Sequence, residues 1–297
     1  MISLKRKLID KLSHTIFFFA TTLATILTVG IIWFVFAQGL RPFLAGNRYG
    51  SYSVIQFIMG RAWRPRFAVY GIGYMIVSTL VATFWAIAMA IPIALGTAIF
   101  ITEFAPKWLA GTLQFCIECL AGIPSVFYGI FGFVILLPMI ERISPYPHGE
   151  SLLAVILILA AMSLPTMCLI MINALKNVDS IFKEGSFALG TSKRQTIVSV
   201  VVPVARGGIM TGVMIGAARA IGETMAVALV AGNREGGYIG RGFPFQTVRL
   251  LTTNIVMEQS YATELHGQLL WSTAIVLLVF IMIINVTLRQ INQGGRK

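Results

Sequence analysis

Apolar residues occur in six long runs separated by polar or charged segments. The runs are roughly Thr15 to Phe36, Ile76 to Ile101, Leu113 to Pro138, Leu152 to Leu175, Ile209 to Gly232 and Leu269 to Leu288. Each has about 20 residues or more, the length with which a helix spans the hydrocarbon core of a bilayer. Backbone groups in lipid must be hydrogen-bonded internally, and the alternation typical of barrel strands is absent. The pattern therefore predicts an all-α membrane protein with six transmembrane helices.

Two of these runs contain residues that disturb a helix. Pro92 lies within the second run, where it predicts a kink. In the third run, Gly122-Ile123-Pro124-Ser125 predicts a break. Broken backbone at membrane depth is tolerated where it lines a cavity or is buried in protein, so Ser125 is a candidate residue of a substrate pathway. A kink that serves only packing is the alternative.

The polar segment between the fourth and fifth runs, Asn177 to Val202, predicts two short helices. Asp179 or Ser180 can cap the first helix, and Gly190 can end it because glycine accepts the left-handed conformation. The second helix is expected over Ser192 to Val201. Two short helices held between membrane spans form a rigid projection on which a second protein can push. An ordinary loop with chance helices is the alternative.

Two charged residues lie inside the fifth run. Arg219 and Glu223 are four residues apart, so a continuous helix would place them on one face. A charge at bilayer depth is costly and usually faces a cavity on a pathway. Arg219 can present a fork of donors to a phosphate oxyanion, while Glu223 holds that fork or repels the anion and keeps binding weak. The alternative is a structural ion pair, since the surrounding small residues allow close helix packing.

The composition supports a membrane protein rather than a soluble one. Hydrophobic residues make up 57% of the chain and charged residues only 11%, against about 25% charged in a soluble domain. The net charge of +12 comes from residues that flank the apolar runs and form no stripe with stacking aromatics. We therefore interpret them as topology determinants and lipid headgroup contacts, and not as a nucleic-acid surface.

The placement of Lys and Arg moderately favours a cytoplasmic N-terminus and a cytoplasmic C-terminus. The first predicted outer loop, residues 37–70, goes against this rule. It carries Arg41, Arg48, Arg61, Arg64 and Arg66. We expect this loop to be a structured segment that contacts something.

No catalytic, metal or cofactor site is predicted. Cys116 and Cys119 form C-x-x-C, but the stretch around them is mostly apolar and no second ligand pair follows, so small residues inside a helix are the expected interpretation. The histidines at 14, 148 and 266 are scattered near span ends or in loops and are expected to be non-catalytic. The sequence has no G-x-x-x-x-G-K-[ST] run, so ATP would have to be bound by a partner.

The segment between the fourth and fifth runs resembles the EAA loop of ABC importer permeases. That pattern is Glu-Ala-Ala, three residues, Gly, nine residues and Ile-x-Leu-Pro. Here Glu184, Gly190 and Pro203 stand at the pattern's spacing, with Gly185 and Ser186 in place of the two alanines. The resemblance implies that these five residues couple the chain to a separate ATPase subunit, which holds the loop in a cleft.

Three further stretches narrow the resemblance to the permeases of phosphate importers. Ala218 to Asn233 is similar to the span-five signature of the Pst system, and Ile101 to Phe133 resembles the stretch that leads through span three. Leu251 to Gly267 looks more like the PstC subunit family than its PstA partner. The resemblance runs from about Gly71 to the C-terminus. It implies the type I, MetI-like importer permease fold.

The same resemblance implies a substrate pathway and a division of the chain into two parts. Arg219 and Glu223 are expected on the phosphate pathway, and we place Thr224 and Ser125 beside them. Residues 1–70 are expected to hold the cytoplasmic tail, the first span and the outer loop, and residues 71–297 the permease core. The chain would lie in the bacterial plasma (inner) membrane.

The implied partners are a PstA-like second permease, two ATPase subunits and a periplasmic or lipid-anchored phosphate-binding protein. Three other functions stay open at this point: an importer of another oxyanion, an ion-driven transporter or channel, and a membrane enzyme. The EAA spacing argues against the ion-driven transporter, and the lack of a nucleophile or metal set argues against the enzyme. Whether the pore is a heterodimer or a homodimer also stays open.

Overall fold

A computed structural model describes residues 2–44, 46–236, 240 and 242–294 of the chain. Five helices are long and apolar enough to cross a membrane, and a bent pair of helices brings the number of spans to six. The long helices are α1 (Ile2–Gly39), α3 (Gly73–Ile99), α7 (Leu152–Lys176), α10 (Val202–Gly222) and α13 (Glu264–Gly294). The prediction of an all-α membrane protein is confirmed.

Shorter elements connect the long helices. On the first half of the chain they are η1 (Arg41–Phe43), α2 (Val54–Met59), β1 (Trp63–Arg64), η2 (Pro65–Phe67), β2 (Val69–Tyr70), η3 (Phe100–Phe104), α4 (Lys107–Ala121), α5 (Ser125–Phe131), η4 (Gly132–Leu136) and α6 (Leu137–Glu141). On the second half they are α8 (Ser180–Ala188), α9 (Lys193–Thr196), η5 (Ile197–Val201), α11 (Met225–Val230) and α12 (Leu251–Glu258). η3, η4 and η5 are π-helical turns.

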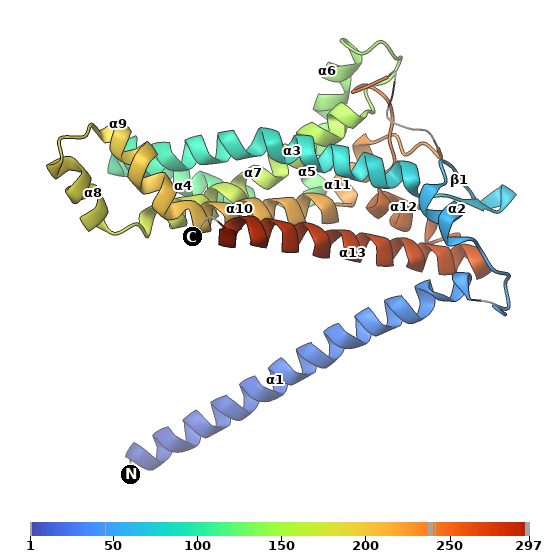
Figure 1. Cartoon of the computed structure of the whole chain (residues 1–297), viewed down its shortest axis with the longest axis horizontal. Coiled ribbons are helices and arrows are strands. Elements are labelled where there is room, and N and C mark those ends of the chain that lie inside the picture. Colours follow the sequence, from blue (N-terminus) through green and yellow to red (C-terminus); the bar gives the residue numbers. More distant parts are fainter. Residues whose placement is uncertain (1, 45, 237–239, 241, 295–297) are drawn as a thin grey trace.

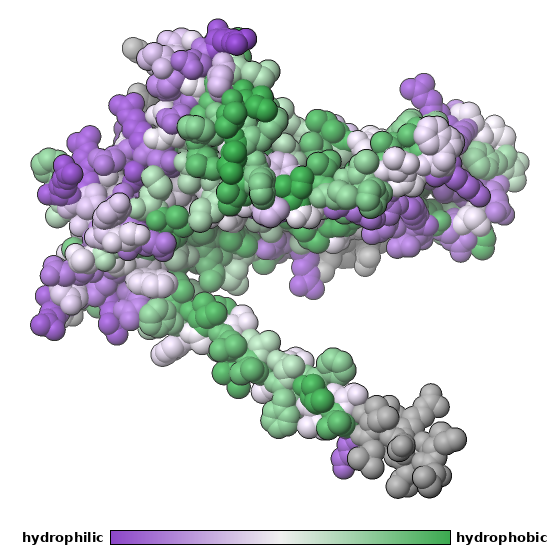
Figure 2. Space-filling model, turned by 180° about the vertical axis from the view of Figure 1, so that it is seen from behind, coloured by the Kyte–Doolittle hydropathy of each residue, from purple (hydrophilic) through white to green (hydrophobic). Residues whose placement is uncertain are grey.

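α3, α7, α10 and α13 lie along one axis of the molecule. α8 and α9 project from one end of this axis, and α2, the β1–β2 hairpin and α12 lie at the other end (Figure 1). The start of α1 and the end of α13 lie toward the end that carries α8 and α9. Figure 2 shows hydrophilic residues gathered at both ends and a hydrophobic band between them, as expected for a protein that spans a bilayer.

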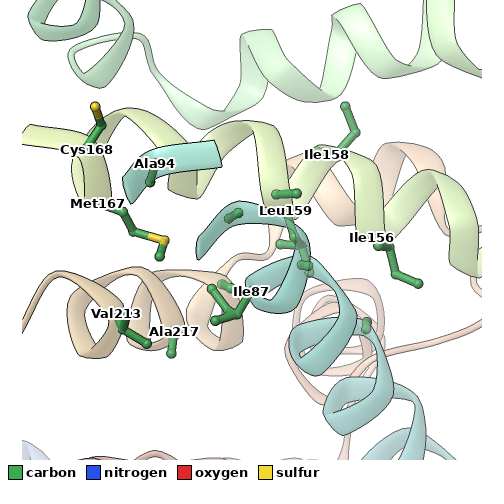
Figure 3. Packing of buried hydrophobic residues seen from close by; sticks show 14 of the residues in the cluster. Ile87, Ala94, Ile156, Ile158, Leu159, Met167, Cys168, Val213 and Ala217 are labelled. Carbon is green, nitrogen blue, oxygen red and sulfur yellow. The ribbon is translucent and has the colours of Figure 1, made fainter. Parts of the chain in front are cut away.

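The core lies where α3, α7 and α10 meet. Buried side chains of all three helices form one cluster there, with Met167 of α7 pointing toward Val213 and Ala217 of α10 (Figure 3). Small residues bring α10 close to α7: a Cβ added at Gly216 would lie 2.6 Å from the Met167 sulfur. The predicted close approach through small residues of the fifth span is confirmed.

Helix α1 lies apart from this core. None of its apolar window is buried, and Figure 1 shows its N-terminal part diverging from the rest of the molecule. It joins α13 only near its C-terminal end. There the Ser272 hydroxyl donates a hydrogen bond of 2.6 Å to the Gly39 carbonyl, and the Phe34 and Trp271 rings lie 5.3 Å apart.

The third span is broken where the sequence predicts it. α4 ends at Ala121 and α5 begins at Ser125, with a bend of 93° between the two halves. Pro92, by contrast, lies inside a helix that runs without interruption from Gly73 to Ile99. The glycine and proline together at residues 122–124 therefore break a helix, whereas the single proline leaves α3 continuous.

The fifth span contradicts the prediction of one continuous run from Ile209 to Gly232. α10 ends at Gly222, and α11 begins only at Met225. Glu223 has an extended backbone with ψ 132°, and its carbonyl oxygen accepts a hydrogen bond of 2.9 Å from the Thr252 hydroxyl. The contact with α12 thus replaces the helical bond that this carbonyl would otherwise make.

Candidate functional site

The break in the fifth span is formed by Glu223 and Thr224. The Glu223 carboxylate accepts a hydrogen bond of 3.1 Å from the Ala226 backbone N–H, so it satisfies one of the free donors at the start of α11. The Thr224 hydroxyl donates to the Gly222 carbonyl at 3.2 Å. Both predicted pathway residues therefore shape the break itself. Glu223 is 9% exposed, and a carboxylate buried to this extent needs such donors.

Arg219 lies in the last turn of α10 and does not contact Glu223. Its Nη1 donates a hydrogen bond of 2.6 Å to the Thr166 hydroxyl of α7. The predicted placement of Arg219 and Glu223 on one helix face is wrong, because the helix ends between them and the carboxylate turns to α11. The alternative of a structural Arg219–Glu223 ion pair is excluded by the same geometry.

Arg219 forms no ion pair with any carboxylate in the described residues. Within the part of the chain that the structure describes, no carboxylate lies within 4.0 Å of its guanidinium, the distance that defines an ion pair. A guanidinium has five N–H donors, and one of them is used by a neutral hydroxyl. The remaining donors and the uncompensated charge are suited to a planar or tetrahedral oxyanion.

The outer halves of the two broken spans pack against each other. A Cβ added at Gly129 of α5 would lie 2.8 Å from the Ala226 Cα and 2.8 Å from the Leu229 side chain of α11. Ser125, the predicted pathway residue, is half-buried in the first turn of α5. The described structure shows no hydrogen bond from Ser125 to Arg219 or Glu223, so its role in a pathway stays a prediction.

Replacing Gly129 with valine is expected to destabilise this contact between α5 and α11. The new side chain meets backbone atoms, which cannot turn aside as a flexible side chain can, and overpacking of this kind costs about 1–3 kcal/mol. Thermal unfolding of the purified protein in detergent is the measurement, and a lower midpoint is expected. Gly111→Ala is the control, because a Cβ there meets nothing within 4 Å. Equal midpoints for Gly129→Val and the wild type would contradict the contact.

The segment between α7 and α10 forms the predicted pair of short helices. The Asp179 carboxylate accepts a hydrogen bond of 3.0 Å from the Ile181 N–H and caps α8. Gly190 follows the end of α8 with φ +79°, the left-handed conformation that the sequence predicts for it. Ser192 and Gln195 form a capping box at the start of α9. These three local signals fix the elbow between α8 and α9.

A cluster of hydroxyls holds the elbow together. The Ser186 hydroxyl lies 2.7 Å from that of Thr191 and 3.0 Å from that of Thr196. Ser186 is buried, whereas Glu184 and Gly185 are exposed. The serine that replaces an alanine of the EAA pattern thus ties α8 to α9, and its two neighbours in the pattern are left on the surface.

The exposed face of α8 is apolar as well as charged. Ile181 is 68% exposed and Leu189, just after the helix, is 86% exposed, beside the exposed Glu184. α8 projects from one end of the long axis, and hydrophilic residues gather at both ends of the molecule (Figures 1 and 2). Exposed apolar side chains grouped on a projecting helix are typical of a surface that docks to another protein.

The sequence predicts that the second short helix ends at Val201, but in the structure it continues. α9, the π turn η5 and α10 form one helical run from Lys193 to Gly222. Pro203 lies inside this run, directly after the π turn. In a regular α-helix its ring would meet the carbonyl of Ser199, and the wider π turn relieves that clash. The elbow and the fifth span are therefore one continuous element.

The elbow is also connected to the end of α3. Lys183 of α8 forms an ion pair of 2.6 Å with Glu103 of η3, and the Lys193 ammonium lies 5.0 Å from the centroid of the Phe104 ring. The Glu103 side chain is 9% exposed and the Lys183 side chain 27%. A partly buried ion pair of this kind resists separation more than a fully exposed one. These two contacts thus join the elbow to η3, at the end of α3.

Two residues of this region escaped the sequence analysis. Thr166 binds Arg219 across 53 residues of sequence, and Glu103 binds Lys183 across 80. A polar residue beside Pro165 in an apolar run, and an acidic residue at the end of another run, were the available signals. Neither signal indicates which residue the side chain would bond to.

Among the described residues, no group of three or more His, Cys, Asp and Glu side chains could hold a metal ion. Cys116 and Cys119 lie within α4, as the sequence predicts, and both are free and exposed.

Sequence relatives identify the family to which this fold belongs. Residues 90–297 match the family described as binding-protein-dependent transport system inner membrane component. A protein of Bacillus subtilis, named probable ABC transporter permease protein YqgH, is 36% identical over 89% of this chain and 85% of its own length. The phosphate transport system permease protein PstC of Pasteurella multocida is 34% identical over 68% of this chain and 70% of its own length.

Solved structures show the same fold at low sequence identity. The MetNI methionine ABC transporter matches with a TM-score of 0.60 and 17% identity, over 78% of this chain and 99% of the transporter chain. A bacterial ABC transporter involved in the import of alginate also matches with a TM-score of 0.60, over 93% of this chain and 96% of its own, at 15% identity. The predicted type I importer permease fold is therefore confirmed. The chain belongs to the family of binding-protein-dependent transport system inner membrane components and is an ABC importer permease.

Proposed function

We propose that this chain is the PstC-like subunit of an ATP-driven importer of inorganic phosphate. It would pair with a PstA-like permease in the bacterial plasma membrane, with two ATPase subunits on the cytoplasmic side and a phosphate-binding protein on the outer side. The end with α8 and α9, toward which both termini point, would be cytoplasmic (Figure 1). The identity to several PstC proteins supports this assignment.

The observation that carries the proposal is the uncompensated guanidinium of Arg219. A cation held at membrane depth by one neutral hydroxyl attracts an anion, and the low dielectric of the surroundings strengthens that attraction. If Glu223 had paired with it, the site would have been neutral and of little use to a phosphate ion. Because the carboxylate is bonded to α11, the positive charge stays available.

The broken spans suggest how such a site opens and closes. Arg219 ends the inner half of span five, whereas Glu223 and Thr224 begin the outer half. The two halves join through an extended residue, so they can change their relative angle without breaking helical bonds. ATP binding would bring the ATPases together and move α8 and α9, and the inner half would carry Arg219 with it. Phosphate would then meet the guanidinium from one side of the membrane at a time.

Exchanging the charges of Lys183 and Glu103 tests whether their ion pair transmits the motion of α8 to η3 and α3. Lys183→Glu alone is expected to lower the number of phosphate ions moved per ATP several-fold, because two carboxylates then face each other between α8 and η3. The double variant Lys183→Glu/Glu103→Lys is expected to regain much of that ratio. Transport and ATP hydrolysis are measured together in proteoliposomes. If Lys183→Glu moves as many phosphate ions per ATP as the wild type, the ion pair does not couple ATP hydrolysis to transport.

Reconstitution tests the proposed substrate. The purified chain, its partner permease and its ATPase are placed in proteoliposomes with the binding protein outside and ATP inside. Accumulation of radiolabelled phosphate that needs both ATP and the binding protein is expected. A hundredfold excess of molybdate or a phosphonate should leave most of the phosphate uptake intact. Uptake driven by an ion gradient without ATP would contradict the ABC mechanism, and preferential uptake of another oxyanion would contradict the assignment to phosphate.

A further inference from the structure

The outer loop with unexpected arginines is a rigid hairpin. β1 and β2 pair in antiparallel fashion, with Trp63 opposite Tyr70. Trp63 has no exposed surface, and its ring packs 5.2 Å from Tyr70 and 5.7 Å from His266 of α13. The backbone N–H of Trp63 also donates a 2.9 Å hydrogen bond to the Glu235 carbonyl. The buried tryptophan thus fixes the hairpin to two other parts of the chain.

The tip of the hairpin presents cations and an aromatic ring to the outside. Arg64 and Arg66 are exposed, and Phe67 between strands β1 and β2 is 75% exposed. Tyr261, beyond the end of α12, is 78% exposed and lines the same depression of about 590 Å³ as these three residues. A second depression beside it, of about 530 Å³, is shared by Arg64 and Arg234. The combination is an arginine-rich rim with two aromatic side chains.

The composition of this surface favours a protein partner over a small anion or lipid. Arginine, tyrosine and phenylalanine are enriched at protein interfaces, and arginine and tyrosine dominate their energetic centres. The larger depression is also lined by Glu235, whose carboxylate repels a phosphate ion or an anionic headgroup, and by Glu258, which is paired with Arg249 at 2.8 Å. A folded protein can match such a mixed pattern, with carboxylates opposite the arginines and neutral groups opposite the glutamates.

The geometry points to an acidic protein surface as the partner. We propose that the tip of the β1–β2 hairpin, together with Arg234 and Tyr261, forms the docking surface for an acidic rim of the phosphate-binding protein. This inference rests on the proposed function, which puts the hairpin on the outer side of the membrane. Because Trp63 holds the hairpin in place before binding, little conformational freedom is lost on docking.

Docking is measured with the complete transporter in nanodiscs. The rate of ATP hydrolysis is recorded against the concentration of phosphate-loaded binding protein. For Arg64→Glu/Arg66→Glu, the half-saturating concentration is expected to rise at least tenfold, with the maximal rate recovered at saturation. For Phe67→Ser a rise of several-fold is expected. The wild-type half-saturating concentration should increase with added salt, and that of the double variant should increase less.

The control variant is Arg41→Glu/Arg48→Glu, which makes the same change of charge on the same outer loop away from both depressions. It is expected to keep the wild-type half-saturating concentration. A wild-type value for the hairpin variants overturns the docking inference, whereas failure of any binding protein to stimulate the wild-type transporter overturns the proposed function instead. If Arg64→Glu/Arg66→Glu does not assemble, Phe67→Ser and the salt dependence of the wild type decide the question.

Two other outcomes would assign the hairpin to a different ligand. A higher phosphate requirement at saturating binding protein would make it a site of anion capture. An effect seen only in nanodiscs of anionic lipid would make it a headgroup contact. Either result overturns the proposal.

Discussion

Replacing Arg219 with alanine is expected to lower phosphate uptake roughly 10- to 100-fold at an unchanged level of protein in the membrane. A hydrogen bond from a charged donor contributes about 1.5–3 kcal/mol, and each 1.4 kcal/mol corresponds to a factor of ten. Arg219 has the charge and the free donors to make such bonds with phosphate. Initial uptake of radiolabelled phosphate by cells that depend on this transporter is the measurement.

Two variants distinguish the effect of losing the Arg219 guanidinium on uptake from an effect of destabilising the protein. Thr166→Val removes the neutral acceptor but keeps the charge, so its loss of uptake is expected to be smaller than that of Arg219→Ala. Arg206→Ala removes an exposed arginine from the same helix and is expected to transport normally. Wild-type uptake by Arg219→Ala would remove this residue from the phosphate pathway and with it the main support for the proposed substrate.

Replacing Gly190 with valine is expected to uncouple ATP hydrolysis from transport. Gly190 has φ +79°, a conformation that a β-branched residue adopts only at a cost of about 1–3 kcal/mol. A Cβ at this position meets no atom of the chain within 4 Å, so the effect would come from the backbone and not from a collision. The expected result is at least a tenfold lower ratio of phosphate transported to ATP hydrolysed in proteoliposomes.

Asparagine at the same position is the matched comparison. It is close to valine in size but tolerates the left-handed conformation better. Gly190→Asn is therefore expected to retain more coupling than Gly190→Val. If both variants couple as well as the wild type, the shape of the elbow does not matter to force transmission. If both fail equally, contact of this glycine with the ATPase, and not its conformation, is the cause.

Local signals were sufficient to predict most of the helices. The six apolar runs, the break at residues 122–125, the cap at Asp179 and the turn at Gly190 each depend on residues within a few positions of one another. Such features follow from the preferences of proline, glycine and capping side chains. The family resemblance rested on the same strings of residues, and the relatives confirm it.

Features that depend on distant residues could not be predicted. At the break, the Glu223 carbonyl accepts a hydrogen bond from the Thr252 hydroxyl, and Arg219 donates to Thr166 on another helix. Similarly, only the fold shows that Trp63 is buried against His266 and that the arginines beside it therefore sit on a fixed hairpin. The pathway roles of Arg219, Glu223, Thr224 and Ser125 stay predictions. So do the coupling role of the EAA-like residues (Glu184, Gly185, Ser186, Gly190 and Pro203) and the division of the chain at residue 70.

Under the proposed function, the continuous helix that begins at Lys193 would act as a lever. Its 30 residues end one position before the extended Glu223, and at about 1.5 Å per residue they reach about 45 Å. A tilt of about 5° about its Lys193 end would move the far end by roughly 4 Å. A displacement of that size exceeds the length of a hydrogen bond, so it would separate Arg219 from Thr166 while the outer half of the span keeps its position.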